Sequence, residues 1–153
     1  MVEGVSAIAP LTVPDGSTVF NFFNGETPMA TQDKCCSIVP YFKIASGKTE
    51  EFKEICDRFI EQTKTEPKCL YYGFSFYEDI AHCREGYEDA EGVLIHLENV
   101  GIILEEALKI SELIQLEIHG CEAEISKLRS PLASLNPKFF GLEYGFRNHK
   151  NCE

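Results

Sequence analysis

Hydrophobic and polar residues follow two different periods within the segment 81–104. Over 81–88 they alternate, which predicts a strand with Glu85 and Tyr87 on the same face. Asp89 comes next and suits a helix N-cap, because its carboxylate can accept a hydrogen bond from a free backbone N–H of the first turn. Apolar residues then recur three or four positions apart, which predicts a helix. The positions of this apolar stripe are Val93, Leu94, Leu97, Val100, Gly101 and Leu104.

The same two periods predict the remaining elements. Alternation indicates strands, and apolar residues three or four apart indicate helices. In chain order we expect a strand at 36–44, a helix that opens within 46–52 and is stopped by Pro67, strands at 69–77 and 113–119, a helix at 121–129 and a strand at 138–146.

The first six elements read strand, helix, strand, strand, helix, strand. This order predicts an α+β fold of the ferredoxin-like type, a split βαβ repeat with both helices on one face of an antiparallel sheet. Glu78 and Asp79 form a polar turn that should join two strands as a hairpin. The open face of such a sheet is normally polar. Here the strand at 69–77 carries Tyr or Phe on both faces, so we expect a second subunit to cover that face, with room for a ligand.

The chain divides into three parts by composition. Residues 1–35 are predicted to form an irregular N-terminal arm, since residues 1–33 contain three prolines and lack Lys and Arg. The arm either docks on the domain through 19–23, VFNFF, or is disordered. Residues 36–147 form the predicted domain, and 148–153 a loose C-terminal tail.

Composition narrows the classes of function. The chain has 153 residues, 44% hydrophobic and 25% charged, as expected of one globular domain. A net charge of −11 argues against nucleic-acid binding and against an anionic membrane surface. The seven cysteines are odd in number and contain no CxxC, which favours a reducing, cytoplasmic compartment and predicts no metal site.

Two short motifs carry a family resemblance. CREGYED followed by AEGVLIHLENV resembles the hairpin strand and helix of the antibiotic biosynthesis monooxygenase-like proteins, with Glu85, Tyr87, Asp89 and His96 at the family's Glu, aromatic, acidic and His positions. EPKCLYYGFSFYED resembles the family's Pro-Gly-Cys entry into the preceding strand, with Lys68 where Gly is usual. The resemblance covers 36–146.

The resemblance implies a homodimer whose facing sheets form a dimeric α/β barrel, with an apolar pocket between sheet and helices in each subunit. It also implies an activity without a cofactor: some members oxidise quinols or polycyclic phenols with O2, and others degrade haem. This chain contains no Trp, which departs from both the oxygenase and the haem-degrading patterns.

The candidate catalytic residues are His96, Glu85 and Asn99. A histidine with a near-neutral pKa suits proton transfer to or from a phenol. His96 and Asn99 lie three apart, so both can project from one side of the helix. His96 can equally be a structural histidine bonded in the core. Glu85 could orient His96 or form a structural ion pair with Arg84 or Lys43.

Aromatic residues supply the candidate substrate-binding surface. Four of them could line a pocket for a flat ligand, or could simply fill the core and the dimer interface. These residues are Tyr72, Phe74, Phe76 and Tyr87.

Two classes of function therefore stay open. The first is a cofactor-independent monooxygenase, or a related enzyme, that acts on a small aromatic molecule such as a quinol or phenol. The second is a non-catalytic dimeric binding module for a small apolar ligand.

Overall fold

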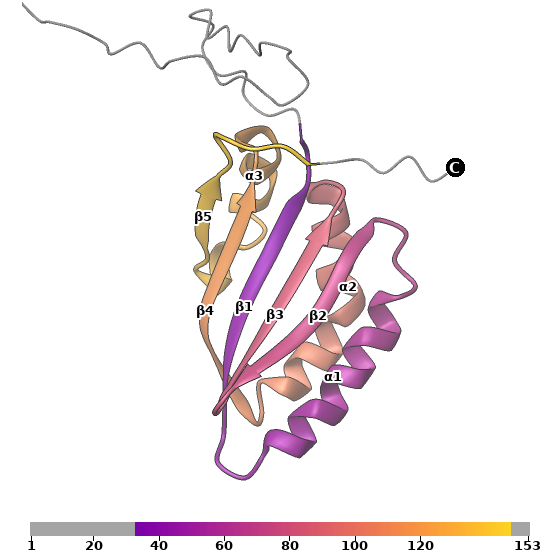
Figure 1. Ribbon diagram of the computed structural model, residues 1–153, viewed down its shortest axis with the longest axis vertical. Helices are drawn as coiled ribbons and strands as arrows, with labels where there is room; N and C mark the ends of the chain where they lie inside the picture. The colour runs from indigo at the N-terminus through magenta and orange to yellow at the C-terminus, as the bar shows by residue number, and fades with distance from the viewer. Residues whose placement is uncertain (1–32, 148–153) are drawn as a thin grey trace, which may run out of the picture.

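The structure is a computed structural model that describes residues 33–147. The predicted arm at 1–35, apart from its last three residues, and the predicted tail at 148–153 lie outside the described residues. The elements, labelled in Figure 1, are β1 (Cys36–Ile44), α1 (Thr49–Thr63), β2 (Cys69–Tyr77), β3 (Ile80–Tyr87), α2 (Ala90–Ala107), β4 (Ser111–Gly120), α3 (Glu122–Arg129), the short 3-10 helix η1 (Ala133–Leu135) and β5 (Lys138–Gly141).

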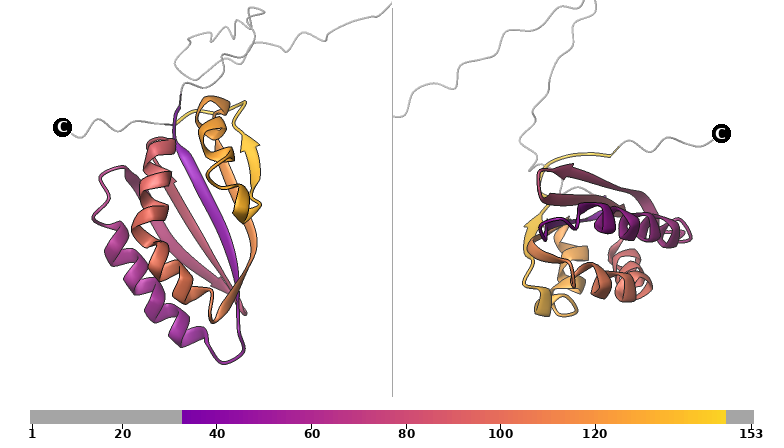
Figure 2. Two further views of the ribbon diagram at one scale, coloured as in Figure 1. Left: turned by 180° about the vertical axis from the view of Figure 1, so that it is seen from behind. Right: turned by 90° about the horizontal axis from the view of Figure 1, so that it is seen from below.

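The strands form one sheet in the order β2-β3-β1-β4-β5. The pairs β2–β3, β3–β1 and β1–β4 are antiparallel, and β5 runs parallel to β4. Figure 2 shows that α1, α2 and α3 all lie on one face of this sheet, which leaves the other face without helices. The predicted ferredoxin-like α+β fold is confirmed, with α3, η1 and β5 added after the six elements of the repeat.

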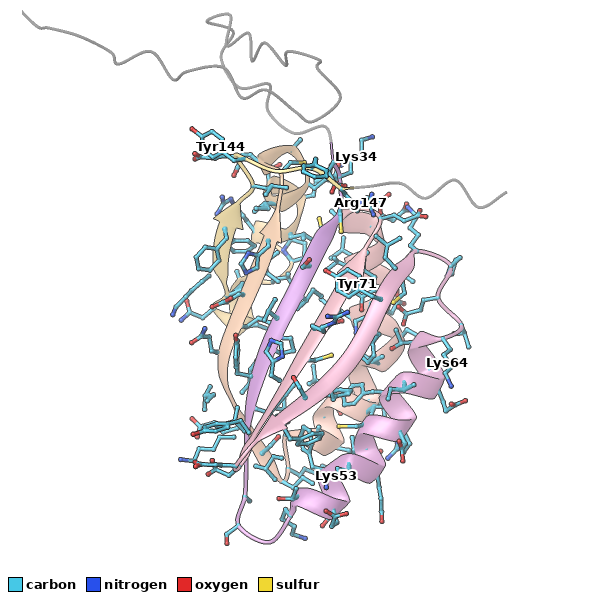
Figure 3. All side chains as sticks on the ribbon, in the orientation of Figure 1. Lys34, Lys53, Lys64, Tyr71, Tyr144 and Arg147 are labelled. Carbon is cyan, nitrogen blue, oxygen red and sulfur yellow. The ribbon has the colours of Figure 1, made fainter. Side chains whose placement is uncertain are left out.

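Strand alternation separates the two faces of the sheet as predicted. In β3, Glu85 and Tyr87 point toward the helices and are buried, whereas Arg84 points away and is exposed. The cross-strand register places Tyr72 of β2 opposite Glu85, so both side chains enter the layer between sheet and helices. Figure 3 shows Tyr71, the neighbour of Tyr72, on the helix-free face.

Helix α2 starts where predicted but presents a rotated face to the sheet. Asp89 is the N-cap, and its carboxylate accepts a hydrogen bond of 2.9 Å from the backbone N–H of Gly92. Several positions of the predicted stripe, including Leu94 and Leu97, are only partly buried, and His96 lies in the middle of the buried face. The buried residues of the helix are Ala90, Gly92, Val93, His96, Val100, Ile103 and Ala107.

The prediction of a last strand over 138–146 was wrong in length. β5 ends at Gly141, because its partner β4 ends at Gly120 and offers no ladder beyond that point. Tyr144 and Phe146, which the predicted strand included, lie beyond β5 and are 73% and 84% exposed.

Candidate functional site

A pocket lies between the sheet and the helices, where two clusters of the hydrophobic core meet. Its cavity volume is about 50 Å³, enough for a few water-sized groups, so a ring-sized ligand requires side chains of the wall to move. Most of the wall is apolar. The pocket is lined by Ile38, Pro40, Phe42, Phe59, Tyr72, Phe74, Cys83, Glu85, His96, Leu97, Val100, Leu104, Leu113, Leu116, Ile118, Leu132 and Leu135.

Glu85 and His96 form an acid–base pair in this wall. Nε2 of His96 lies 3.1 Å from Oε2 of Glu85, and the two side chains are 3% and 4% exposed, respectively. Strand β3 supplies the carboxyl group and α2 supplies the imidazole. The pocket therefore has a polar, titratable end in an apolar surrounding, as is common where proteins fix the orientation of a small ligand.

A second carboxyl group holds the other side of the imidazole. Nδ1 of His96 lies 3.0 and 3.1 Å from the two carboxyl oxygens of Glu66. Glu66 lies in the turn between α1 and β2 and is buried. Sequence reasoning missed this residue. It belongs to no periodic element, and its spacing of 30 residues from His96 carries no recognisable signal.

Burial shifts the pKa values of the pair in opposite directions. It raises the pKa of Glu85 to about 8, against a smaller lowering by the hydrogen bond from Tyr87. Burial also lowers the pKa of His96, although the nearby Glu66 carboxylate acts in the opposite direction. At neutral pH the imidazole is therefore neutral and Glu85 carries a proton. In that state Nδ1–H donates to Glu66, and Nε2 is an unprotonated nitrogen 3.1 Å from Oε2 of Glu85.

Two tyrosines enclose the pair. The Tyr87 hydroxyl donates to Oε2 of Glu85, and its ring centroid lies 5.1 Å from that of His96. The Tyr72 ring lies 5.4 Å from the imidazole and lines the pocket. Burial raises the pKa of both phenols above the ordinary value, so both hydroxyls stay protonated near neutral pH.

The structure separates the aromatic candidates. Tyr72 and Phe74 line the pocket. Tyr87 is fully buried behind Glu85 and does not line it, and Phe76 is 39% exposed, with the Lys53 ammonium group 5.7 Å from its ring. Phe76 misses the pocket because it lies near the far end of β2.

Asn99 lies outside the pocket, and Glu85 takes one of its two expected roles, the contact with His96. The Asn99 side chain does not line the pocket, and its Nδ2 donates to Oε1 of Glu66 at 2.7 Å. Glu85 orients toward His96, so the alternative of an ion pair with Arg84 or Lys43 was wrong. Arg84 lies on the opposite sheet face, and Lys43 pairs with Asp79.

The described residues contain neither a metal-binding cluster nor a spanning helix. Within 33–147, no group of three or more His, Cys, Asp and Glu side chains is placed to hold a metal ion. No helix in the same range is long and apolar enough to cross a membrane.

Fold and site together define a ferredoxin-like domain with a largely apolar pocket between its sheet and its helices. The chain belongs to the antibiotic biosynthesis monooxygenase-like family. It is similar to MupZ from Pseudomonas fluorescens at 45% identity and a TM-score of 0.75, over 77% of this chain and 92% of MupZ. No protein-family model matches the chain, and no curated protein matches it either.

More distant structures share the fold alone. A candidate antibiotic biosynthesis monooxygenase from Nitrosomonas europaea is 18% identical, with a TM-score of 0.55 over 60% of this chain and 94% of its own. A conserved protein from Methanosarcina mazei is 20% identical, with a TM-score of 0.51 over 56% of this chain and 91% of its own.

Proposed function

We propose that this protein is an acid–base enzyme that acts on a small, largely apolar molecule in the pocket between sheet and helices. The observation that carries the proposal is the contact of 3.1 Å between His96 and Glu85 at the polar end of that pocket. A buried acid and base in contact can exchange a proton without solvent, and groups with shifted pKa values in a cleft are typical of catalytic sites.

The geometry supports a two-proton transfer from a bound hydroxyl. Glu85 passes its proton to Nε2 of His96 as its carboxyl group takes the hydroxyl proton of the ligand. The products are an alkoxide or phenolate, a protonated Glu85 and an imidazolium. The negative charge of Glu66, 3.0 Å from Nδ1, stabilises this imidazolium. Because the pocket excludes much of the water, these electrostatic contacts act in a medium of low dielectric constant.

The family membership supports a finer proposal, cofactor-independent oxidation of a quinol or phenol by O2. Ionising the hydroxyl makes the ring easier to oxidise. One oxygen atom of O2 then enters the product as a carbonyl at a ring carbon. The other leaves as water, with the hydrogen of that ring carbon and the proton released by the hydroxyl group. Tyr72 and Phe74 supply aromatic surface for a flat ring at the pocket wall.

Oxygen uptake with a panel of quinols and polycyclic phenols tests this function. We expect His96→Gln to lower the rate by about 10²–10⁴, as is typical for loss of a general base. Glu98→Gln is the matched control, because Glu98 is an exposed residue of the same helix. Equal rates for the two variants and the parent would contradict the role of His96. Oxygen consumption at the background rate with every substrate would contradict oxidation.

One observation favours a second candidate, a binding module without catalysis. Both nitrogens of His96 already have carboxyl partners, so the network is complete without a ligand. In that case a small apolar molecule should co-purify with the protein. His96→Gln should then change ligand affinity or stability, with no reaction detectable in the parent.

We also propose a homodimer formed through the helix-free face of the sheet. One row of outward-facing residues crosses all five strands there, in the order Tyr71, Gly86, Ser37, His119 and Phe140. Tyr71 and Phe140, at the two ends of the row, are exposed aromatics. A stable homodimer commonly buries about 2,000 Å² or more. Sedimentation velocity at micromolar concentration should give a dimer, and a monomer would contradict the proposal.

The cysteines support a cytoplasmic location. Six of them, Cys35, Cys36, Cys56, Cys69, Cys83 and Cys121, are free thiols in the structure. Free thiols persist in a reducing compartment. Fractionation of the producing cells should recover the protein with soluble cytoplasmic markers, and recovery from an extracytoplasmic fraction would contradict this location.

A further inference from the structure

A chain of polar contacts leads from the pocket pair to the surface of the helices. Oε1 of Glu66, which contacts His96, accepts a hydrogen bond from Nδ2 of Asn99 at 2.7 Å. Asn99 in turn accepts one from Nε2 of Gln62 at 2.6 Å. We call these three residues, Gln62, Asn99 and Glu66, the clamp. It joins the C-terminal part of α1 and the following turn to the middle of α2.

We propose that Glu66 is a positioning residue for His96: the clamp keeps the imidazole proton on Nδ1, so that Nε2 is the nitrogen that exchanges a proton with Glu85 and, through Glu85, with a bound ligand. The inference deepens the proposed acid–base function and rests on it. Glu66 does not line the pocket and acts only through His96, which it contacts.

Hydrogen-bond chemistry supports this tautomer. A neutral imidazole has one N–H donor and one acceptor nitrogen, and the hydrogen bond at one nitrogen decides the state of the other. An ionised carboxylate can only accept, so Glu66 requires a donor at Nδ1. Glu85, protonated because burial raises its pKa to about 8, requires an acceptor at Nε2. Both requirements are met by one tautomer, with the proton on Nδ1.

The clamp also explains how Glu66 remains in position. Glu66 is 8% exposed, and among residues 33–147 no Lys or Arg lies within ion-pair distance of it. Its hydrogen-bond donors are Nδ1 of His96 and Nδ2 of Asn99. Its backbone is fixed too, since its N–H donates to the carbonyl of Thr63 and its carbonyl accepts from the N–H of Cys69. A carboxylate held at both ends fixes the orientation of the ring that it contacts.

The titratable groups around the imidazole are few. Glu66 comes from the turn after α1, Tyr72 from β2, and Glu85 and Tyr87 from β3. Burial raises the pKa of both tyrosines above the ordinary value. The tautomer and the charge of His96 therefore depend chiefly on Glu66 and Glu85.

Nitrogen-15 NMR of the full chain without a ligand tests the proposal. Long-range proton–nitrogen correlations distinguish a protonated from an unprotonated ring nitrogen, and we expect the proton on Nδ1 at neutral pH. Glu66→Leu removes the acceptor, so the proton should move to Nε2 and bond to Glu85. Glu66→Gln keeps an acceptor oxygen and should keep the Nδ1 tautomer. It should also lower the pKa of His96 further, because the Glu66 charge raises that pKa.

The control and the contradicting outcomes are independent of catalysis. Glu98→Leu removes an exposed carboxylate from the same helix and should leave the imidazole signals unchanged. A proton on Nε2 in the parent, or an unchanged tautomer in Glu66→Leu, would overturn the proposal. If Glu66→Leu does not fold, the spectra of the parent and of Glu66→Gln still show whether the imidazole proton is on Nδ1. Absence of any turnover would contradict the proposed function while leaving this NMR result intact.

An activity measurement then separates positioning from a purely structural role. Glu66→Gln should shift the acidic limb of the pH–rate profile to lower pH, following the lowered pKa of His96. Glu66→Leu should lose about 10² or more in rate, as expected when a general base presents the wrong nitrogen. A uniform loss with an unchanged pH profile in Glu66→Gln would overturn the positioning role.

Discussion

Tyr87 donates its hydroxyl hydrogen to the carboxyl group of Glu85, the residue two positions earlier on β3. Residues two apart on a strand share a face, so both point into the layer between sheet and helices. There the acid meets His96 on one side and Tyr87 on the other. The alternation of one strand thus supplies two of the four titratable groups around the imidazole of His96, and the other two are Glu66 and Tyr72.

Glu85→Gln should make the protein more stable at neutral and mildly alkaline pH. Burial raises the pKa of Glu85 from its ordinary value of 4.5 to about 8, so the folded state binds a proton that the unfolded state releases. The stability associated with this group is complete below pH 4.5 and is lost as pH rises to about 8. Gln mimics the protonated acid at every pH. Its advantage should grow with pH by at most about 1.4 kcal/mol per unit.

Denaturant unfolding of parent and variant between pH 6.5 and 8.5 measures this difference. The unfolded-state imidazole of His96 titrates near its ordinary pKa of 6.5 in parent and variant alike, so this contribution cancels in the difference between them. The gap should widen up to about pH 8 and then stay constant. A constant gap over the whole range would show that Glu85 is ionised when the protein is folded.

Tyr87→Phe should raise the pKa of Glu85 above its value in the parent. The hydrogen bond from Tyr87 lowers the pKa of Glu85, whereas burial raises it. Without the hydrogen bond, the effect of burial is larger and the pKa should rise. We expect a loss of about 1–3 kcal/mol in stability, since the change removes a buried hydrogen bond. Infrared absorption of the protonated carboxyl group, followed against pH, reports the shift. Tyr77→Phe, at an exposed position of β2, should leave the titration unchanged.

Gly86→Ala should destabilise the sheet through Tyr71. A Cβ atom at position 86 would lie 2.4 Å from two ring atoms of Tyr71, and the Tyr71 hydroxyl is held 2.8 Å from Oγ of Ser37. Moving the ring breaks this hydrogen bond, and we expect a cost of about 1–3 kcal/mol.

Gly73→Ala is the matched control for that variant. Gly73 lies on the neighbouring strand, and no atom lies within 4 Å of a Cβ built there. Thermal unfolding should show a loss for Gly86→Ala alone, with part of the loss recovered in the Gly86→Ala, Tyr71→Ala double variant. Equal melting temperatures for the two alanine variants would refute the contact.

Deleting Met1 to Pro28 should leave a folded domain. Every element of the described structure begins at Cys36 or later, and its hydrophobic core is built from residues 36–132. A single cooperative melt near that of the full chain is the expected result in calorimetry. Loss of cooperativity would place part of residues 1–28 in the core.

Periodicity alone predicted the helices and strands that have one face on the hydrophobic core and the other face toward solvent. β1 and β2 have the predicted bounds, and the buried residues of α1 form the regular stripe of a helix with one face on the core. The Asp89 cap was predictable for a related reason, because capping joins a side chain to a backbone group only three residues away. In each case the physical cause acts within a few positions of the chain.

The length of β5 and the rotation of α2 depended on partners elsewhere in the chain. β5 carries a good alternation past Gly141, but a strand extends only as far as its neighbour, and β4 ends at Gly120. α2 buries His96 more deeply than Leu94, because its packing against sheet and α1 decides which stripe faces inward.

The candidate site, too, was predictable from the sequence only in part. The sequence alone determined that Glu85 and Tyr87 share a face and that His96 lies on the helix that follows them. Only the tertiary structure decided that Glu66, 30 residues before His96, completes the imidazole environment, and that Phe76 lies away from the pocket. The physical reason is that hydrogen bonds between buried side chains depend on how separate elements pack, and neither period encodes that packing.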